Sequence, residues 1–153
     1  MEEKDLQATV EHLLLAAGID LLEFEVVHHK GRNKVKAVIY RKEGTGTDEC
    51  AKAHRLILPQ IQMALGDQDP YMEIYSPGID RVLKTEKEWK VFTGKMIMFQ
   101  TADEPGWQYG RLLGYEEGTI KIASGETVRE IPRTMIRKAK LDSLHEGDKA
   151  HGI

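Results

Sequence analysis

Apolar positions in the first half of the chain change their spacing from one segment to the next. Two segments place them three or four residues apart, as amphipathic helices do, and two alternate apolar with polar residues, as half-buried strands do. With a third short strand, the expected elements are helix, strand, strand, helix and strand, at residues 4–17, 20–29, 34–41, 47–65 and 71–75. This α-β-β-α-β order predicts a small sheet with helices on one face.

The alternation also assigns a face to each strand residue. The expected inward side chains are Leu22, Phe24 and Val26 in the first strand, and Val35, Ala37 and Ile39 in the second. If the two strands form a hairpin, Lys34 and Lys36 share the outer face with Glu23 and Glu25. Such cross-strand pairs contribute only about 0.2–1 kcal/mol each.

After residue 84 the pattern changes to short strands separated by closely spaced glycines. A short amphipathic helix at residues 86–92 is followed by four or five strands, at 95–100, 107–115, 118–123, 126–131 and 136–141. This spacing predicts a small β-barrel. We therefore expect an α+β protein with an N-terminal α/β domain, a barrel domain and a mobile polar tail, at residues 1–84, 85–142 and 143–153.

Composition limits the possible partners and the compartment. Residues 1–84 hold 11 Lys and Arg against 14 Asp and Glu, and the remainder holds 11 of each, so the net charge is −3. Contact with RNA would therefore need a local patch or a protein partner. Cys50 is the only cysteine, which excludes an internal disulfide. There is no signal-peptide pattern and no apolar run near the roughly 20 residues that span a bilayer, so we expect a cytoplasmic protein.

Catalytic and metal sites have little support in the sequence. A Gly-rich phosphate loop, a nucleophile elbow and a His-Glu-x-x-His motif are all missing, so we expect no enzyme and no cofactor. Cys50 and His54 are four apart on a predicted helix, a spacing that can place two metal ligands on one face. Cys50 also lies on the apolar stripe, and we interpret it as a buried thiol. His28 and His29 are interpreted as part of a solvated turn.

Two groups of residues offer contacts with RNA. Four basic residues occupy alternate positions along the chain: Lys30, Arg32, Lys34 and Lys36. Pairing of the last two with glutamates would leave Lys30 and Arg32 available for phosphate. The same pairing leaves Arg41 and Lys42 at the other end of the strand. Four aromatic residues either stack on bases or pack in the core or at a domain interface, and we favour packing: Trp89, Phe92, Trp107 and Tyr109.

The segment Ser76-Pro-Gly-Ile-Asp-Arg81 is a sharp turn directly after a predicted strand. Proline fixes φ and glycine allows positive φ, so the pair reverses the chain tightly. The turn is either a structural hinge between two domains or a display of amides and Arg81 to a phosphate or carboxylate. Asp80 bonds to nearby amides or pairs with Arg81. The candidate partner-binding residues are Ser76, Pro77, Gly78, Asp80 and Arg81, together with Lys30 and Arg32.

The run Ile74-Tyr-Ser-Pro-Gly-Ile-Asp-Arg-Val-Leu-Lys84 resembles the signature stretch of the RimP family of bacterial ribosome maturation factors. Other segments resemble the family in the same order, at residues 18–27, 47–55, 92–95, 110–114, 131–132 and 136–141. The resemblance covers roughly residues 5–141. Val82 departs from it, because the family often has proline there, and Lys140 stands where an arginine is common.

The resemblance implies an N-terminal α/β domain and a C-terminal SH3-like (Sm-like) barrel. It also implies a factor that binds the immature small ribosomal subunit and promotes its assembly without chemistry. The implied partners are rRNA and a basic ribosomal protein of the decoding region, which an acidic factor suits. We expect a monomer that does not bind membranes. The alternative is a free-standing RNA-binding module of the Sm-like type.

Overall fold

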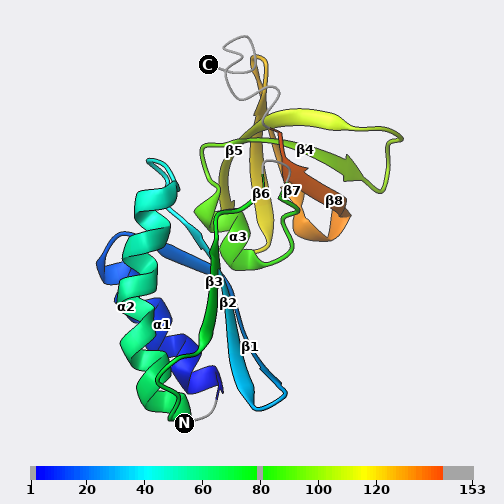
Figure 1. Ribbon diagram of the computed structural model, residues 1–153. Coiled ribbons are helices and arrows are strands. Elements are labelled where there is room, and N and C mark those ends of the chain that lie inside the picture. Colours follow the sequence, from blue (N-terminus) through cyan, green and yellow to red (C-terminus); the bar gives the residue numbers. More distant parts are fainter. Residues whose placement is uncertain (1–2, 79–80, 143–153) are drawn as a thin grey trace. The chain divides into compact units, whose positions relative to one another are not determined.

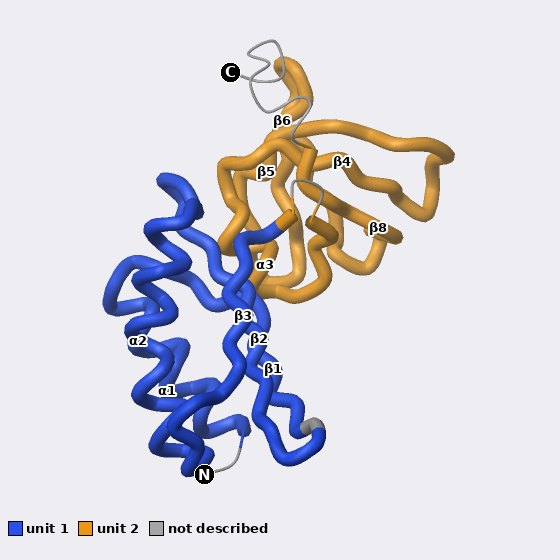
Figure 2. The backbone as a smooth tube through the Cα atoms, in the orientation of Figure 1, with its two compact units in different colours: residues 1–77 blue, residues 78–153 orange. Residues whose placement is uncertain are grey.

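The computed structural model describes residues 3–78 and 81–142. The chain divides into two compact units, residues 1–77 and 78–153 (Figure 2). The sequence placed a domain boundary after residue 84, and independent folding of two domains stays a prediction. The tail expected at 143–153 lies outside the described residues. None of the helices in the described part is long and apolar enough to cross a membrane.

The first unit is a three-stranded sheet with two helices on one face (Figure 1). Its elements are α1 (Glu3–Ala16), β1 (Asp20–His29), β2 (Arg32–Tyr40), α2 (Thr47–Leu65) and β3 (Tyr71–Tyr75). Strand β2 is central, with β1 antiparallel on one side and β3 parallel on the other. A parallel neighbour needs a long crossover, and α2 supplies it. The observed order of elements is the one that the hydrophobic spacing predicts.

The core of the first unit lies between the helices and the inner face of the sheet. Leu6, Val10 and Leu14 from α1 and Ala53, Ile57 and Ile61 from α2 meet the inner side chains of β2, which are Val35, Ala37 and Ile39. All nine are at most 2% exposed. The inward face predicted for the second strand is therefore confirmed.

The face predicted for the first strand is wrong at its beginning. Leu21 is buried, whereas Leu22, expected to point inward, is only half-buried. The pairing of β1 with β2 shifts register between Leu21 and Glu23. A β-bulge places one extra residue in a strand and so exchanges its faces. Phe24 and Val26, which follow the bulge, pack against the core as expected.

The second unit is a short helix followed by a five-stranded antiparallel sheet. Its elements are α3 (Glu86–Val91), β4 (Met96–Thr101), β5 (Gln108–Glu116), β6 (Thr119–Ser124), β7 (Thr127–Pro132), a 3-10 turn (Arg133–Met135) and β8 (Ile136–Leu141). The strand order is β7-β6-β5-β4-β8. No ladder joins β7 to β8 in the described part of the sheet, so the SH3-like barrel stays a prediction. The protein is a mixed α+β protein.

The four aromatic residues considered as a stacking platform separate into two pairs. Trp89 and Phe92 are fully buried, as core packing predicts. Tyr109 is 40% exposed on β5, and Trp107 is half-buried in the segment before that strand. Core packing is thus confirmed for the first pair. Tyr109 does not pack in the core, and packing of the second pair at a domain interface stays a prediction.

Candidate functional site

Arg81, at the end of the signature turn, forms an ion pair within the second unit. Its Nε lies 2.7 Å from Oε2 of Glu88, and the two side chains are only 15% and 3% exposed. Glu88 is the third residue of α3 and also caps that helix. Its Oε1 accepts hydrogen bonds from the backbone N–H groups of Lys84 and Thr85, while the Thr85 hydroxyl accepts one from the Glu88 N–H. One carboxylate therefore fixes both Arg81 and the start of the helix.

The charge of Glu88 is maintained despite its burial. Burial raises the pKa of a carboxyl group, but the hydrogen bond from Arg81 and those from the backbone of Lys84 and Thr85 lower it more. The net effect is a Glu88 pKa below the ordinary value of 4.5. At neutral pH the contact is thus between a full positive and a full negative charge.

Val82 and Lys140, the two positions that depart from the family pattern, lie opposite each other. They form an isolated antiparallel bridge. Its hydrogen bonds are donated by the N–H groups of Leu83 and Leu141 to the carbonyl groups of Ala139 and Arg81. Because the N–H of Val82 makes neither bond, a proline after the arginine would remove neither of these two hydrogen bonds.

The other residues of the turn are accessible where the structure describes them. Ser76 and Gly78 are exposed and Pro77 is half-buried, directly after the end of β3. Asp80 lies outside the described residues, so its expected bonds to amides or to Arg81 stay predictions. The turn therefore offers exposed groups at Ser76 and Gly78, whereas the Arg81 side chain is engaged by Glu88.

Lys30 and Arg32 lie at the opposite end of the first sheet from Ser76. Lys30 and Gly31 both have positive φ, 50° and 74°, and form the tight turn between β1 and β2. Because β2 and β3 are parallel, the turn lies beside the start of β3 and Ser76 follows its end. At about 3.3 Å per residue the two ends are roughly 20 Å apart. The structure therefore does not bring the predicted residues into one site.

A basic and aromatic surface lies between those two ends, on the sheet face away from the helices. It consists of the side chains of Arg32, Lys34 and Lys36 on β2 and of Tyr71, Glu73 and Tyr75 on β3, and is called the β2–β3 face below. The Arg32 guanidinium and the Lys34 ammonium lie 5.5 and 5.9 Å from the Tyr71 ring centre. The Lys36 ammonium lies 5.8 Å from the Tyr75 ring centre.

Glu73 connects the two halves of the β2–β3 face. Its carboxylate lies 3.0 Å from the Lys34 ammonium and accepts a 2.7 Å hydrogen bond from the Tyr75 hydroxyl. These two bonds lower the pKa of Glu73. They also raise the pKa values of Tyr75 and Lys34. At neutral pH the lysine is therefore charged and the tyrosine hydroxyl keeps its proton.

The cross-strand pairing predicted for the lysines is only partly correct. Lys36 lies opposite Glu25 in the ladder, as expected, but the bulge places Glu23 opposite Val38. Lys34 pairs with Glu73 on β3 instead. At the other end of β2, Arg41 pairs with Glu43 and Glu49 at 3.3 and 3.5 Å, so it does not stay available as the sequence suggested.

A metal centre needs several ligands close together. Among the residues that the structure describes, no group of three or more His, Cys, Asp or Glu side chains could hold a metal ion. Cys50 is half-buried against the core. Burial and the nearby Glu49 raise its thiol pKa. His28 is exposed on β1, and the side chain of His29 lies outside the described residues.

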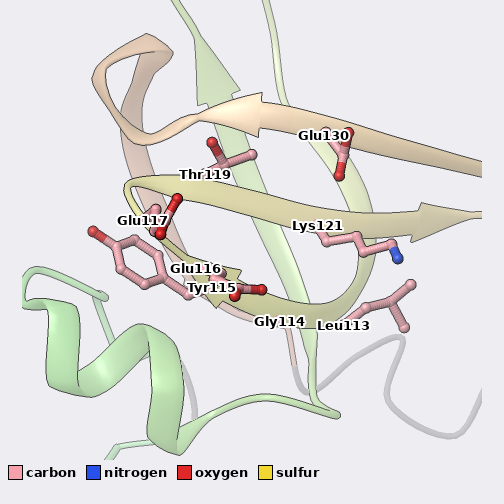
Figure 3. A pocket seen from close by; sticks show the side chains of 8 residues that line it. All are labelled: Leu113, Gly114, Tyr115, Glu116, Glu117, Thr119, Lys121 and Glu130. Atoms are coloured by element: carbon pink, nitrogen blue, oxygen red, sulfur yellow. The ribbon is translucent and has the colours of Figure 1, made fainter.

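A shallow hollow of about 520 Å³ lies on the second unit (Figure 3). Leu113, Gly114, Tyr115, Glu116, Glu117, Thr119, Lys121 and Glu130 line it. Three carboxylates against one lysine make it acidic, and Leu113 adds an apolar side chain that is 40% exposed. This chemistry suits a basic side chain with an aliphatic stem.

Tyr71 and Tyr75 are the surface residues that reasoning from the sequence missed. The signal was present, because Tyr71, Glu73 and Tyr75 alternate with the more apolar Met72 and Ile74 in the third strand. What the sequence could not supply is the strand beside which they lie. Only the parallel pairing with β2 places the two tyrosines next to its basic residues.

Two comparisons with known proteins agree with this architecture. A family model of the RimP N-terminal domain matches residues 9–80, nearly all of the first unit. The chain is also 24% identical over 127 residues to the ribosome maturation factor RimP of Borrelia hermsii (strain HS1 / DAH), covering 83% of this chain and 81% of that protein. An alignment of that length includes part of the second unit as well. Both comparisons support the RimP family for this chain.

Proposed function

We propose that this protein is a ribosome maturation factor that binds the immature small ribosomal subunit in the cytoplasm and promotes its assembly without catalysis. The observation that carries the proposal is the similarity to the Borrelia factor, which extends over most of both chains. A role in binding also agrees with the described residues. Exposed side chains form surfaces for partners, and the buried ion pair Arg81–Glu88 maintains the local fold.

A basic ribosomal protein is the protein partner that the second unit suits. The hollow lined by Glu116, Glu117 and Glu130 would accept lysine or arginine side chains through charge-assisted hydrogen bonds. Closure of the antiparallel sheet into an SH3-like barrel is part of this proposal. The 3-10 turn between β7 and β8, Arg133–Met135, is a short connection of the kind that such closure would use.

The signature turn contributes to subunit binding through its exposed part. Ser76 and Gly78 are exposed, and with Pro77 and Asp80 they are the proposed contacts at this end of the first unit. Lys30 and Arg32 are the proposed contacts at the other end. Arg81 is a positioning residue, since its side chain is held by Glu88.

The test is co-sedimentation in a sucrose gradient with purified small subunits at two stages of assembly. We expect the protein to migrate with immature subunits and to remain at the top of the gradient with mature ones. Equal migration with both, or migration with neither, contradicts the proposal.

A free-standing RNA-binding module is a second candidate, favoured by one observation on the second unit. The Lys140 ammonium lies 5.3 Å from the Trp107 ring centre, and Trp107 directly precedes β5, the strand that carries the exposed Tyr109. Titration with unstructured RNA at several salt concentrations separates the two. Tight binding with a steep salt dependence, without preference for immature subunits, favours the module.

A further inference from the structure

The β2–β3 face is exposed although it carries two large aromatic rings. The helices α1 and α2 lie on the other side of the sheet, and Tyr71 and Tyr75 are 47% and 43% exposed. Tyrosines on an open sheet face leave apolar ring surface exposed to water. Exposed apolar patches of this kind mark recognition surfaces. Both belong to the edge strand β3, so a ligand can approach along that strand.

The spacing of the two rings suits a chain of stacked groups. Tyr71 and Tyr75 are four residues apart on one side of one strand, a separation of about 13 Å. The residue between them, Glu73, is only 22% exposed at its side chain, against 47% for its partner Lys34. A ligand on this face therefore meets the rings and the lysine before it meets the carboxylate.

Each ring has a cation beside it, and this combination identifies the ligand class. Arg32 and Lys34 lie over the Tyr71 ring, and Lys36 lies over the Tyr75 ring, so a base would stack on ring surface that the cations leave open. Nucleic-acid single strands bind to surfaces where bases stack on aromatic rings and phosphates meet cations. A duplex hides the faces of its bases, and an acidic peptide would use the cations but leave the rings without partners.

The charges are distributed so that a bound nucleic-acid strand would lie along β2 and β3. Glu23 and Glu25 lie on β1, on the far side of β2 from the tyrosines. The basic and aromatic side chains are thus grouped on two neighbouring strands, with Glu73 among them and the other two glutamates at their border. Glu73 is a positioning residue here, since it holds the Lys34 ammonium and the Tyr75 hydroxyl.

We propose that the β2–β3 face binds a short segment of single-stranded RNA, with bases stacked on Tyr71 and Tyr75 and phosphates beside Arg32, Lys34 and Lys36. The inference rests on the proposed function, because the RNA would be an unpaired rRNA segment of the immature subunit. It goes beyond that function in naming the strandedness of the RNA and the two rings that bind its bases.

The test is fluorescence anisotropy with a labelled single-stranded RNA of mixed sequence and the full-length protein. Exchanging both tyrosines (Tyr71→Ala with Tyr75→Ala) should weaken binding by about tenfold or more, since each stacked base contributes substantially. Exchanging both for phenylalanine should leave the affinity within about threefold, since stacking needs the ring and not the hydroxyl. Met63→Ala is the control, an exposed apolar side chain on α2 of the same unit, and should change nothing.

A second variant keeps the test valid if the double alanine variant does not fold. Lys36→Gln retains both rings, and it should reduce the slope of log affinity against log salt by about 0.7, the value for one phosphate contact on a single strand. An unchanged slope, an unchanged affinity in the double alanine variant, or an equal loss in Met63→Ala overturns the inference.

The same variants separate this inference from the proposed function. If wild-type protein binds no single-stranded RNA but still sediments with immature subunits, the inference fails and the function stands. If the double alanine variant loses subunits while RNA binding is unchanged, the face binds a protein and the inference also fails. If wild-type protein binds RNA on this face but never sediments with subunits, the proposed function fails.

Discussion

At the scale of single residues, Arg81 shows how a signature residue can support the fold and the site together. The turn was predicted from the sequence because it is a local pattern, whereas the capping box of Thr85 and Glu88, also a local pattern, was not noticed there. The sequence does not indicate that the capping carboxylate also holds Arg81, because that contact depends on how the chain returns after the turn. The observed pair makes Arg81 part of the local architecture of the second unit.

Glu88→Gln tests this pair. The amide keeps the capping geometry but removes the charge, so the free energy of unfolding should fall by about 2–3 kcal/mol at neutral pH. Urea unfolding followed by tryptophan fluorescence measures it, since both tryptophans, Trp89 and Trp107, belong to the second unit. Lys90→Gln, which removes only the exposed pair with Glu86, is the control and should cost no more than about 0.5 kcal/mol.

The effect of Glu88→Gln should depend on pH in one direction. The pKa of Glu88 in the folded protein lies below the ordinary value of 4.5. Its carboxylate therefore contributes stability above that pH, and the contribution is lost as the pH falls through the folded value. The difference between wild type and variant should be largest at neutral pH and shrink as the pH falls below 4.5. A difference that grows in acid would show that another group is responsible.

Gly110 is a position where only glycine fits. A Cβ there would lie against the Ile122 side chain, 2.8 Å from the Ser124 hydroxyl and 2.9 Å from the Ala123 carbonyl oxygen. Gly110→Ala should therefore cost about 1–3 kcal/mol through overpacking between β5 and β6. Gly114→Ala on the same strand meets no atom within 4 Å and is the control. Equal tryptophan-monitored unfolding of the two variants would contradict this account.

At the scale of elements, the strands were predictable and their neighbours were not. Alternation and turn residues are local signals, so the third strand was predicted at the observed residues 71–75. The register in which strands pair is not determined by the local sequence. The bulge at Leu21 and Glu23 exchanged the face of Leu22, and the parallel pairing of β3 gave Lys34 a partner that the hairpin alone did not suggest. The β2–β3 face arises from that pairing.

The β1–β2 turn holds a lysine in a backbone conformation that favours asparagine or glycine. Lys30 has φ of 50° in front of Gly31, and Asn-Gly is the preferred sequence for such two-residue turns. Lys30→Asn should raise the free energy of unfolding of the first unit by about 0.5–1 kcal/mol. Circular dichroism at helical wavelengths measures it, because the two long helices belong to this unit. A lower melting temperature would show that the lysine makes a stabilising contact.

At the scale of the whole molecule, two units present different chemistry to partners. The first unit presents a basic and aromatic sheet face, and the second presents an acidic hollow. A net charge of −3 conceals this division, which is why composition alone gave no indication of RNA contact. The resemblance to the RimP family was predictable because several short motifs occur in order, and the matched domain at residues 9–80 agrees with it.

The most direct measurement of the central claim is the state of small ribosomal subunits in cells depleted of this protein. Sucrose gradients combined with analysis of the ends of small-subunit rRNA would report it. We expect free small subunits with unprocessed rRNA to accumulate, and wild-type protein to restore the normal profile. A normal profile with fully processed rRNA after complete depletion would contradict a role in maturation of the small subunit.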